Sequence, residues 1–132
     1  MIDPATINLP EVVAEVRTLC ERYERAFVAN ELDALDAFFW ASALVVCFGR
    51  GENLYGIDAI RAFRAARGPA DLSRTLTNTV ITTFGDDVGT ANSEFHGTDS
   101  TLQGRQSQTW VRLAEGWRIV SAHVSLTRIV KP

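Results

Sequence analysis

The stretch that decides the fold is Trp117–Ser125, which reads WRIVSAHVS. Its apolar and β-branched residues predict a strand, and His123 lies in the middle of that strand among hydroxyl groups. A buried imidazole needs a hydrogen-bond partner or a ligand, because leaving its ring nitrogens unpaired costs free energy. The preceding run, Gly104–Trp110, reads GRQSQTW and carries polar residues on both faces. Two neighbouring strands of this kind indicate a sheet that lines a cavity.

Working outward from this hairpin, the second half of the chain is predicted to be β-structure throughout. Runs rich in Thr, Val and Ile are bounded by turn signals such as Gly85–Asp87, and a polar loop is expected at 96–103. The four long antiparallel strands are predicted at Ser73–Phe84, Val88–Phe95, Gly104–Leu113 and Trp117–Arg128.

The first half begins with a long amphipathic helix. Apolar residues recur at helical spacing from Pro10 to about residue 29, and Asn30 can end the helix. Tyr23 lies on the buried stripe, one turn before Phe27. Its phenol could donate a hydrogen bond or a proton inside a cavity, or it could be an amphipathic core residue whose hydroxyl reaches a backbone group.

Two shorter helices and a strand pair complete the chain, with Asp33 and Asp58 as expected helix starts. These elements are predicted at Ala34–Phe39, Leu44–Phe48, Leu54–Gly56 and Ala59–Arg67. The order predicts one α+β domain over residues 1–132. In this domain, a strongly curved antiparallel sheet wraps around the long N-terminal helix as an open cone, with two further helices.

Composition narrows the classes of function. The 132 residues are 46% hydrophobic with a net charge of −3, which disfavours an electrostatic nucleic-acid binder. The two cysteines and two histidines do not have metal-ligand spacing, so no metal site is expected. No bilayer-spanning run and no secretory signal are visible, so we expect a cytoplasmic protein that does not bind membranes.

Cys47 and His123 are the other candidates for chemistry. Cys47 could act as a nucleophile if a base or cation lowered its pKa, or it could be a small buried hydrophobe. His123 could be a general acid or base, or a structural histidine bonded to a neighbouring strand. Strand alternation predicts that His123 shares a face with Ile119, Ser121 and Ser125, opposite Val120, Ala122, Val124 and Leu126.

Several other residues are expected at or near a ligand. Arg64 is a candidate for binding an anion, with a solvated helix face as the alternative, and Arg67 is the next candidate. Which alternate pair of Gly104–Trp110 faces the cavity depends on strand register, which the sequence does not fix. The expected ligand contacts are Cys47, Phe27, Glu52, Tyr55, Phe63, Arg64, Arg105, Ser107 and Ser125.

The chain resembles the AtzH-like (HpxZ-like) family of the NTF2-like, SnoaL-like superfamily. The resemblance covers about residues 10–128 and is carried by Glu52–Gly56 (ENLYG), Ile60–Arg67 (IRAFRAAR), Gly104–Trp110 and Ala122–Leu126 (AHVSL). It implies the cone fold, a cofactor-free pocket, a homodimer and catabolism of small nitrogenous compounds. It also implies an amidase-like activity on small carboxylated ureas or amides, with Tyr23 matching the tyrosine of the family's catalytic pair.

The sequence departs from the family pattern at one position. Cys47 stands before Phe48–Gly49, where the family has a catalytic arginine. A guanidinium there would bind a substrate carboxylate and stabilise an oxyanion, which a neutral thiol cannot do. The departure leaves two hypotheses open: an amidase with Tyr23 and His123 as catalytic residues, and a non-catalytic binding or accessory protein. A SnoaL-type isomerase or hydrolase ranks third, because no carboxylate base is clearly placed inside the cone.

Overall fold

The computed structural model describes residues 1–68 and 70–129. A 3-10 turn, η1 (Pro4–Thr6), precedes the helices α1 (Pro10–Val28), α2 (Leu32–Phe38) and α3 (Ile57–Arg67). The strands are β1 (Val46–Phe48), β2 (Asn53–Tyr55), β3 (Thr75–Phe84), β4 (Val88–His96), β5 (Leu102–Leu113) and β6 (Gly116–Arg128). Every predicted helix and strand is present, with ends that differ by a few residues.

The strands form one six-stranded sheet in the order β2-β1-β6-β5-β4-β3. Four of its neighbouring pairs are antiparallel, as predicted, whereas β1 pairs with β6 in parallel. The sheet is therefore mixed. The parallel pair arises because the chain leaves β2 through α3 and makes β3, β4 and β5 before β6 returns beside β1.

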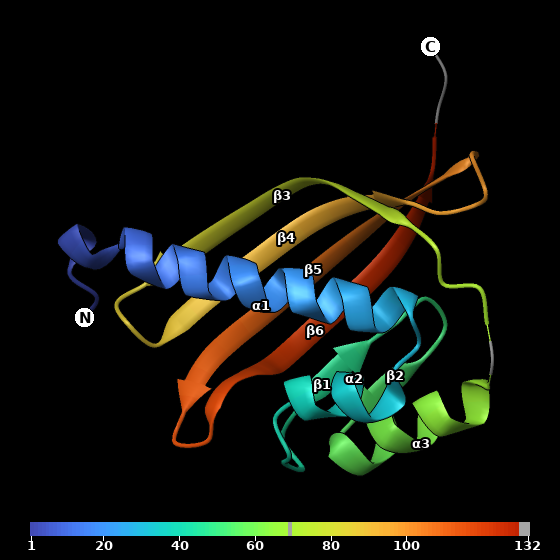
Figure 1. Ribbon diagram of the computed structural model, residues 1–132, viewed down its shortest axis with the longest axis horizontal. Helices are drawn as coiled ribbons and strands as arrows, with labels where there is room; N and C mark the ends of the chain where they lie inside the picture. Colours follow the sequence, from blue (N-terminus) through green and yellow to red (C-terminus); the bar gives the residue numbers. More distant parts are fainter. Residues whose placement is uncertain (69, 130–132) are drawn as a thin grey trace.

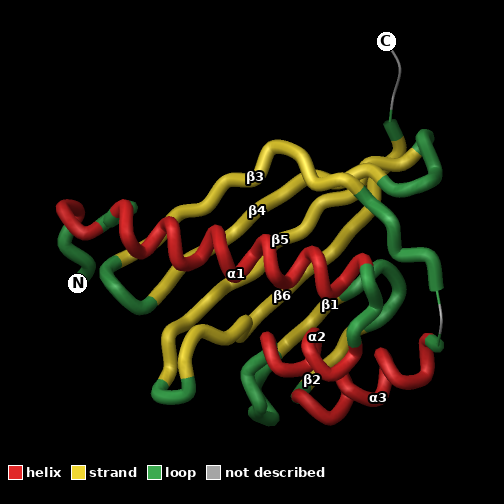
Figure 2. Tube along the Cα trace, viewed as in Figure 1, coloured by secondary structure: helices red, strands yellow, loops and turns green. Residues whose placement is uncertain are grey.

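The helix α1 lies across one face of the curved sheet, and α2 and α3 gather with β1 and β2 at one end (Figure 1). Figure 2 shows the same arrangement, with α1 as a long red helix over the yellow strands β3, β4, β5 and β6. The core between these layers holds fully buried Trp110, Leu35, Ile60 and Ile119. The structure thus confirms the predicted α+β cone, with an unclosed sheet wrapped over the long helix.

Two predicted helix starts are wrong. Glu31 and Gly56 are the N-cap residues of α2 and α3, and neither helix has a side-chain cap. Asp33 and Asp58 instead lie in the first turns, where a carboxylate still interacts favourably with the helix dipole. The predicted end of α1 is confirmed, because Asn30 has a φ of 53°, in the left-handed region where a helix stops.

A bulge in β6 decides which side chains face the cavity. Thr109 pairs with Ser121, but the next residue, Trp110, pairs with Ile119, so Val120 is the extra residue. One inserted residue reverses the alternation of all that follow. Ile119 and Ala122 are both buried on the concave side, and Ser121 and His123 are exposed. The predicted common face of Ile119, Ser121 and His123 is wrong for this reason.

Candidate functional site

A cavity of about 460 Å³ opens between α1, α3, the β1–β2 turn and the concave side of β5 and β6. Its volume suits a small molecule. The residues that line it are Tyr23, Phe27, Cys47, Gly49, Arg50, Gly51, Glu52, Leu54, Phe63, Arg64, Arg67, Leu72, Arg74, Gln106 and Val124. We call this the first cavity.

Arg74 is the most firmly held charge in the first cavity. Its guanidinium donates to both carboxylate oxygens of Glu24, at 2.7 and 2.8 Å, and to Gln106 Oε1 at 2.9 Å. It also lies 4.0 Å from the ring centroid of Phe27 and 4.6 Å from that of Phe95. The side chain is 5% exposed, so these contacts fix its position and neutralise its charge.

Arg64 is paired in a similar way. Its Nη1 donates to Asp36 Oδ1 at 3.2 Å, and its guanidinium carbon lies 4.7 Å from the ring centroid of Phe39. The whole residue is 7% exposed. Arg64 is therefore a buried cation of α3 that lines the first cavity. The alternative prediction, that Arg64 lies on a solvated helix face, is wrong.

Arg67 differs from the other two because no carboxylate pairs with it among the described residues. Its Nη2 donates to Asn30 Oδ1 at 3.0 Å, and its Nε is buried without a hydrogen-bond partner. Burial, followed by the nearby charge of Arg64, lowers the pKa of Arg67. An arginine remains charged in proteins, so this site has a cation whose partner is missing.

Tyr23 lies between these cations on the buried side of α1. It is 6% exposed and packs against the rings of Phe27, Phe38 and Phe39. No described residue forms a hydrogen bond with its hydroxyl. Burial raises the pKa of Tyr23, and Arg64 opposes that rise. The phenol is therefore neutral near pH 7 and able to donate a hydrogen bond or a proton.

Cys47 shares the first cavity with Tyr23 and Arg64. Burial raises the pKa of its thiol, and the charge of Arg64 only partly offsets this. The thiol is therefore protonated near neutral pH, which disfavours the nucleophile hypothesis. No feature of the structure explains why a cysteine stands where the family has arginine.

Glu52 is the carboxylate of the β1–β2 turn that lines the first cavity. Its Oε2 accepts a hydrogen bond from the Gly51 amide at 3.1 Å, and no described arginine or lysine pairs with it. The carboxylate also lies against Gly49, where any side chain would overlap it. Glycine at 49 therefore allows Glu52 to fold back over its own turn.

The structure brings together six of the predicted site residues and leaves five elsewhere. Tyr23, Phe27, Cys47, Glu52, Phe63 and Arg64 all line the first cavity. His123, Tyr55, Arg105, Ser107 and Ser125 are not among its lining residues, and the first four of these are exposed.

The prediction that His123 lies in the cavity is wrong. Beyond the bulge at Val120, His123 projects from the outer face of the sheet, where its ring meets the edge of Phe48 at 5.9 Å between centroids. Tyr55 joins the same outer cluster through Phe48. Across β5, the partner of His123 is Ser107, so both point outward.

Strand register also settles which face of Gly104–Trp110 lines the cavity. Gln106, Gln108 and Trp110 are buried on the concave side, while Arg105 and Ser107 are exposed. Arg105 and Ser107, which were expected to contact a ligand, therefore do not line the first cavity. Ser125, on the same side of β6 as His123, is misplaced for the same reason.

Sequence reasoning missed Arg74, whose role depends on tertiary packing. It precedes β3, and its carboxylate partner lies 50 residues earlier on α1. The one available signal is that Glu24 follows Tyr23 directly, beside the buried stripe of α1. Gln106 and Val124 were recognised as members of their strands, but not as cavity residues.

Metal-ligand clusters and membrane-spanning helices are both absent from the part of the chain that the structure describes. No group of three or more His, Cys, Asp or Glu side chains that could hold a metal ion occurs in residues 1–68 and 70–129. Among the helices of the same ranges, none is long and apolar enough to cross a membrane.

Solved structures resemble the fold closely. A protein of unknown function from Pectobacterium atrosepticum, of the DUF3225 family, is 52% identical with a TM-score of 0.93, covering 96% of this chain and 99% of that one. A cystatin-like fold protein from Burkholderia xenovorans is 45% identical with a TM-score of 0.89, covering 94% and 98%. An NTF2-like protein of unknown function from Pseudomonas putida is 18% identical with a TM-score of 0.76 over both whole chains, and it shows the fold alone.

Curated protein sequences give no significant match. The AtzH-like family model matches residues 5–129, which is nearly the whole chain. This match agrees with the NTF2-like cone and with its cavity between the long helix and the concave sheet. The chain belongs to the AtzH-like family.

Proposed function

We propose that the first cavity binds a small carboxylated amide or urea and that the protein hydrolyses its C–N bond without a cofactor. The observation that carries this proposal is that the guanidinium of Arg67 has no carboxylate partner among the described residues. Arg64 and Arg74 already have protein carboxylates, whereas Arg67 Nε is buried without a partner. A ligand carboxylate would supply the missing acceptor and charge.

The remaining groups of the first cavity fit the chemistry of amide hydrolysis. In the proposed reaction, Glu52 accepts a proton from water as the water oxygen bonds to the substrate carbonyl carbon. The C–N bond then breaks, and the leaving nitrogen takes a proton from the Tyr23 phenol. Proton transfer from the Glu52 carboxyl to the phenolate restores both groups. Arg64 stabilises the oxyanion formed between these steps.

Incubation of the purified protein with 1,3-dicarboxyurea tests the proposal. We expect turnover, measured by loss of the substrate carbonyl signal in carbon NMR. Tyr23→Phe should lower kcat by about 100-fold, because it removes the proton donor. Arg67→Gln should raise KM by about tenfold or more, since it removes a charged hydrogen bond to the substrate. His123→Ala is the matched control, because His123 lies on the outer face.

The neutral Cys47 thiol supports a second candidate, a binding or accessory protein without catalysis. In that case the protein binds the carboxylated urea, and Arg67→Gln weakens binding, but no turnover occurs. Cys47→Arg separates the two candidates further, since it restores the arginine of the family pattern. Turnover in that variant alone would identify the native chain as a non-catalytic relative. Absence of both binding and turnover would contradict the proposed substrate class.

A further inference from the structure

A second cavity of about 380 Å³ lies between α1 and the strands β3, β4 and β5. It is separate from the first cavity, although Gln106 lines both. Glu24 belongs to the second cavity and its ion-pair partner Arg74 to the first. The wall between the cavities is therefore the hydrogen-bonded group Glu24–Arg74–Gln106.

Gln108 directs an unused hydrogen-bond donor toward the second cavity. Its Oε1 accepts from the indole Nε1 of Trp110 at 3.1 Å, and Trp110 is fully buried. Because indole can only donate, this contact fixes which end of the amide is oxygen. The amide nitrogen has no partner among the described residues, although Gln108 is 4% exposed. Because Gln108 lines the second cavity, this donor is available to an acceptor from outside the protein.

Gln106 repeats this arrangement two positions earlier on β5. Its Oε1 accepts from Arg74 at 2.9 Å, and its amide nitrogen has no partner in the described ranges. Residues 106 and 108 lie on the same face of the strand, about 7 Å apart. The floor of the second cavity thus offers two amide donors within reach of one small acceptor group.

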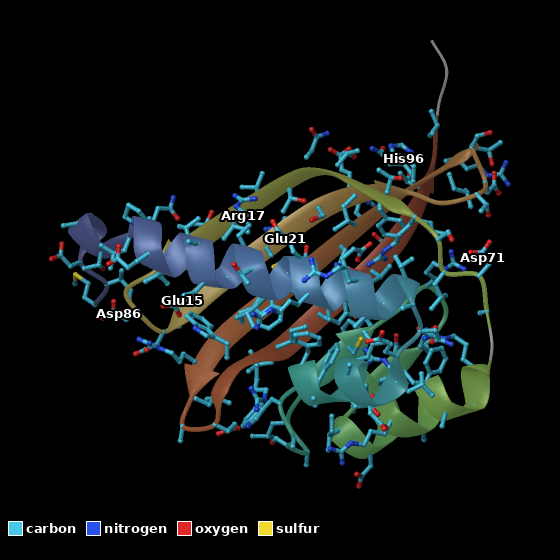
Figure 3. All side chains as sticks on the ribbon, viewed as in Figure 1. Glu15, Arg17, Glu21, Asp71, Asp86 and His96 are labelled. Carbon is cyan, nitrogen blue, oxygen red and sulfur yellow. The ribbon has the colours of Figure 1, made fainter. Side chains whose placement is uncertain are left out.

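The rest of the second cavity combines an apolar wall with a positive rim. Leu76, Ile81 and Ala91 form the wall contributed by β3 and β4. Figure 3 shows Arg17 and Glu21 on the side of α1 that faces these strands, and Arg25 is one turn beyond Glu21. Because Glu24 is paired with Arg74, the other charged groups at the rim are Arg17, Arg25 and the carboxylate of Glu21.

We propose that the second cavity is a distinct small-molecule site that binds a monocarboxylate with a compact apolar body. The carboxylate would accept hydrogen bonds from the amide nitrogens of Gln108 and Gln106, under the positive potential of the rim. The apolar body would contact Leu76, Ile81 and Ala91. Nothing in this inference depends on the chemistry of the first cavity.

Titration of the labelled full-length protein with sodium benzoate, followed by 1H–15N NMR, tests the site. We expect saturable shifts of the Gln108 and Gln106 side-chain amide signals, with a Kd on the order of 1 mM. Benzyl alcohol, which has the same apolar body without the charge, should bind at least about tenfold more weakly.

Three variants locate the binding. Ala91→Leu fills the apolar wall and should abolish the shifts. Gln108→Glu keeps an acceptor for Trp110 but replaces the free donor by a carboxylate, so affinity should fall by at least about tenfold. Arg67→Gln changes only the first cavity and should leave the titration unchanged.

The proposal is overturned if the Gln108 amide does not shift, or if the Gln106 amide of Gln108→Glu titrates with the same Kd as in the native protein. It is also overturned if the shifts are confined to residues of the first cavity and disappear in Arg67→Gln. If the NMR spectrum shows that Ala91→Leu does not fold, Gln108→Glu alone decides the question, because glutamate has nearly the same size and shape as glutamine. Failure here would leave the proposed amidase function untouched, since that is tested with a different ligand and at different residues.

Discussion

Removal of the Glu24 carboxylate should be among the most damaging single changes near the first cavity. Glu24→Ala leaves the guanidinium of Arg74, 5% exposed, without its counter-charge. Two charge-assisted hydrogen bonds are lost, each worth about 1.5–3 kcal/mol. Glu24 itself is 17% exposed, so water can reach part of the vacated space. We therefore expect the lower end of the sum, a loss of about 3 kcal/mol in the free energy of unfolding.

Substitution of the other member of the ion pair, Arg74, should cause a smaller loss in the free energy of unfolding. Arg74→Met keeps an apolar chain between the rings of Phe27 and Phe95 and leaves Glu24 partly hydrated, so we expect a loss of about 1–2 kcal/mol. In the double variant no buried charge is left alone. The double variant should lose about as much free energy of unfolding as Arg74→Met alone, which gives a coupling energy of about 3 kcal/mol between the two residues.

Urea unfolding at pH 7 measures these differences. With an m-value of about 1.5 kcal/mol/M, Glu24→Ala should lower the midpoint by about 2 M without changing the slope. The reasoning is refuted if Glu24→Ala costs less than about 1 kcal/mol, or if the two single losses add to within about 0.5 kcal/mol in the double variant.

Three further predictions concern other parts of the fold. Burial raises the pKa of the Cys20 thiol from 9.0 to about 12, so the folded state holds that proton more tightly. The protonated Cys20 thiol therefore contributes its full stabilisation below pH 9, and this contribution is lost as the pH rises toward 12. In Cys20→Ala, Tm should decrease less steeply with pH across this range than in the native protein. Gly104→Ala should destabilise by about 1–3 kcal/mol, because an added methyl would overlap the ring of Phe95, whereas Gly97→Ala, with only one distant neighbour, should change unfolding by less than about 0.5 kcal/mol. His123→Ala should leave ligand affinity in the first cavity within about twofold, measured by calorimetry, and a larger loss would contradict its outward position.

The fold was predictable from the sequence because its signals are local. The stripe of apolar residues in α1, the Gly85–Asp87 turn and the Thr- and Val-rich strands each specify an element without reference to distant residues. The parallel pairing of β1 with β6 is different. It depends on how two segments meet whose paired residues, such as Val46 and Ser121, are 75 positions apart, and no short pattern in either strand specifies this pairing.

The site was only partly predictable, and a single residue explains two of the five misplaced side chains, His123 and Ser125. Val120 is an ordinary strand residue, so nothing in the sequence marks it as the extra member of a bulge. Its presence turns His123 and Ser125 outward and Val124 toward the cavity. Alternation arguments fail wherever a strand has an unrecognised bulge. The residues predicted from helices or from the β1–β2 turn were not affected.

The distribution of charge in the first cavity gives the strongest argument about its ligand. Arg64 and Arg74 each have a carboxylate partner within the protein, Asp36 and Glu24. Both line the cavity, but neither requires a ligand carboxylate as a counter-charge. Arg67 is held by an uncharged partner, Asn30, so the charge of its guanidinium remains uncompensated. Because no carboxylate among the described residues is hydrogen-bonded to Arg67, its guanidinium is available to one anionic group from outside.

This argument also bears on the neutral residue at position 47. An arginine there would stand beside Arg64 and add a second uncompensated cation to the first cavity. With cysteine, Arg67 at the end of α3 is the partly buried arginine of this cavity that has no carboxylate partner among the described residues, whereas Arg50 at the β1–β2 turn is exposed to solvent. We therefore expect this chain to prefer a ligand with one carboxylate over a dicarboxylate, and Cys47→Arg to reverse that preference. Comparison of calorimetric affinities for matched mono- and dicarboxylated ureas measures it. Equal discrimination by the native chain and by Cys47→Arg would show that charge at position 47 does not set the choice of ligand.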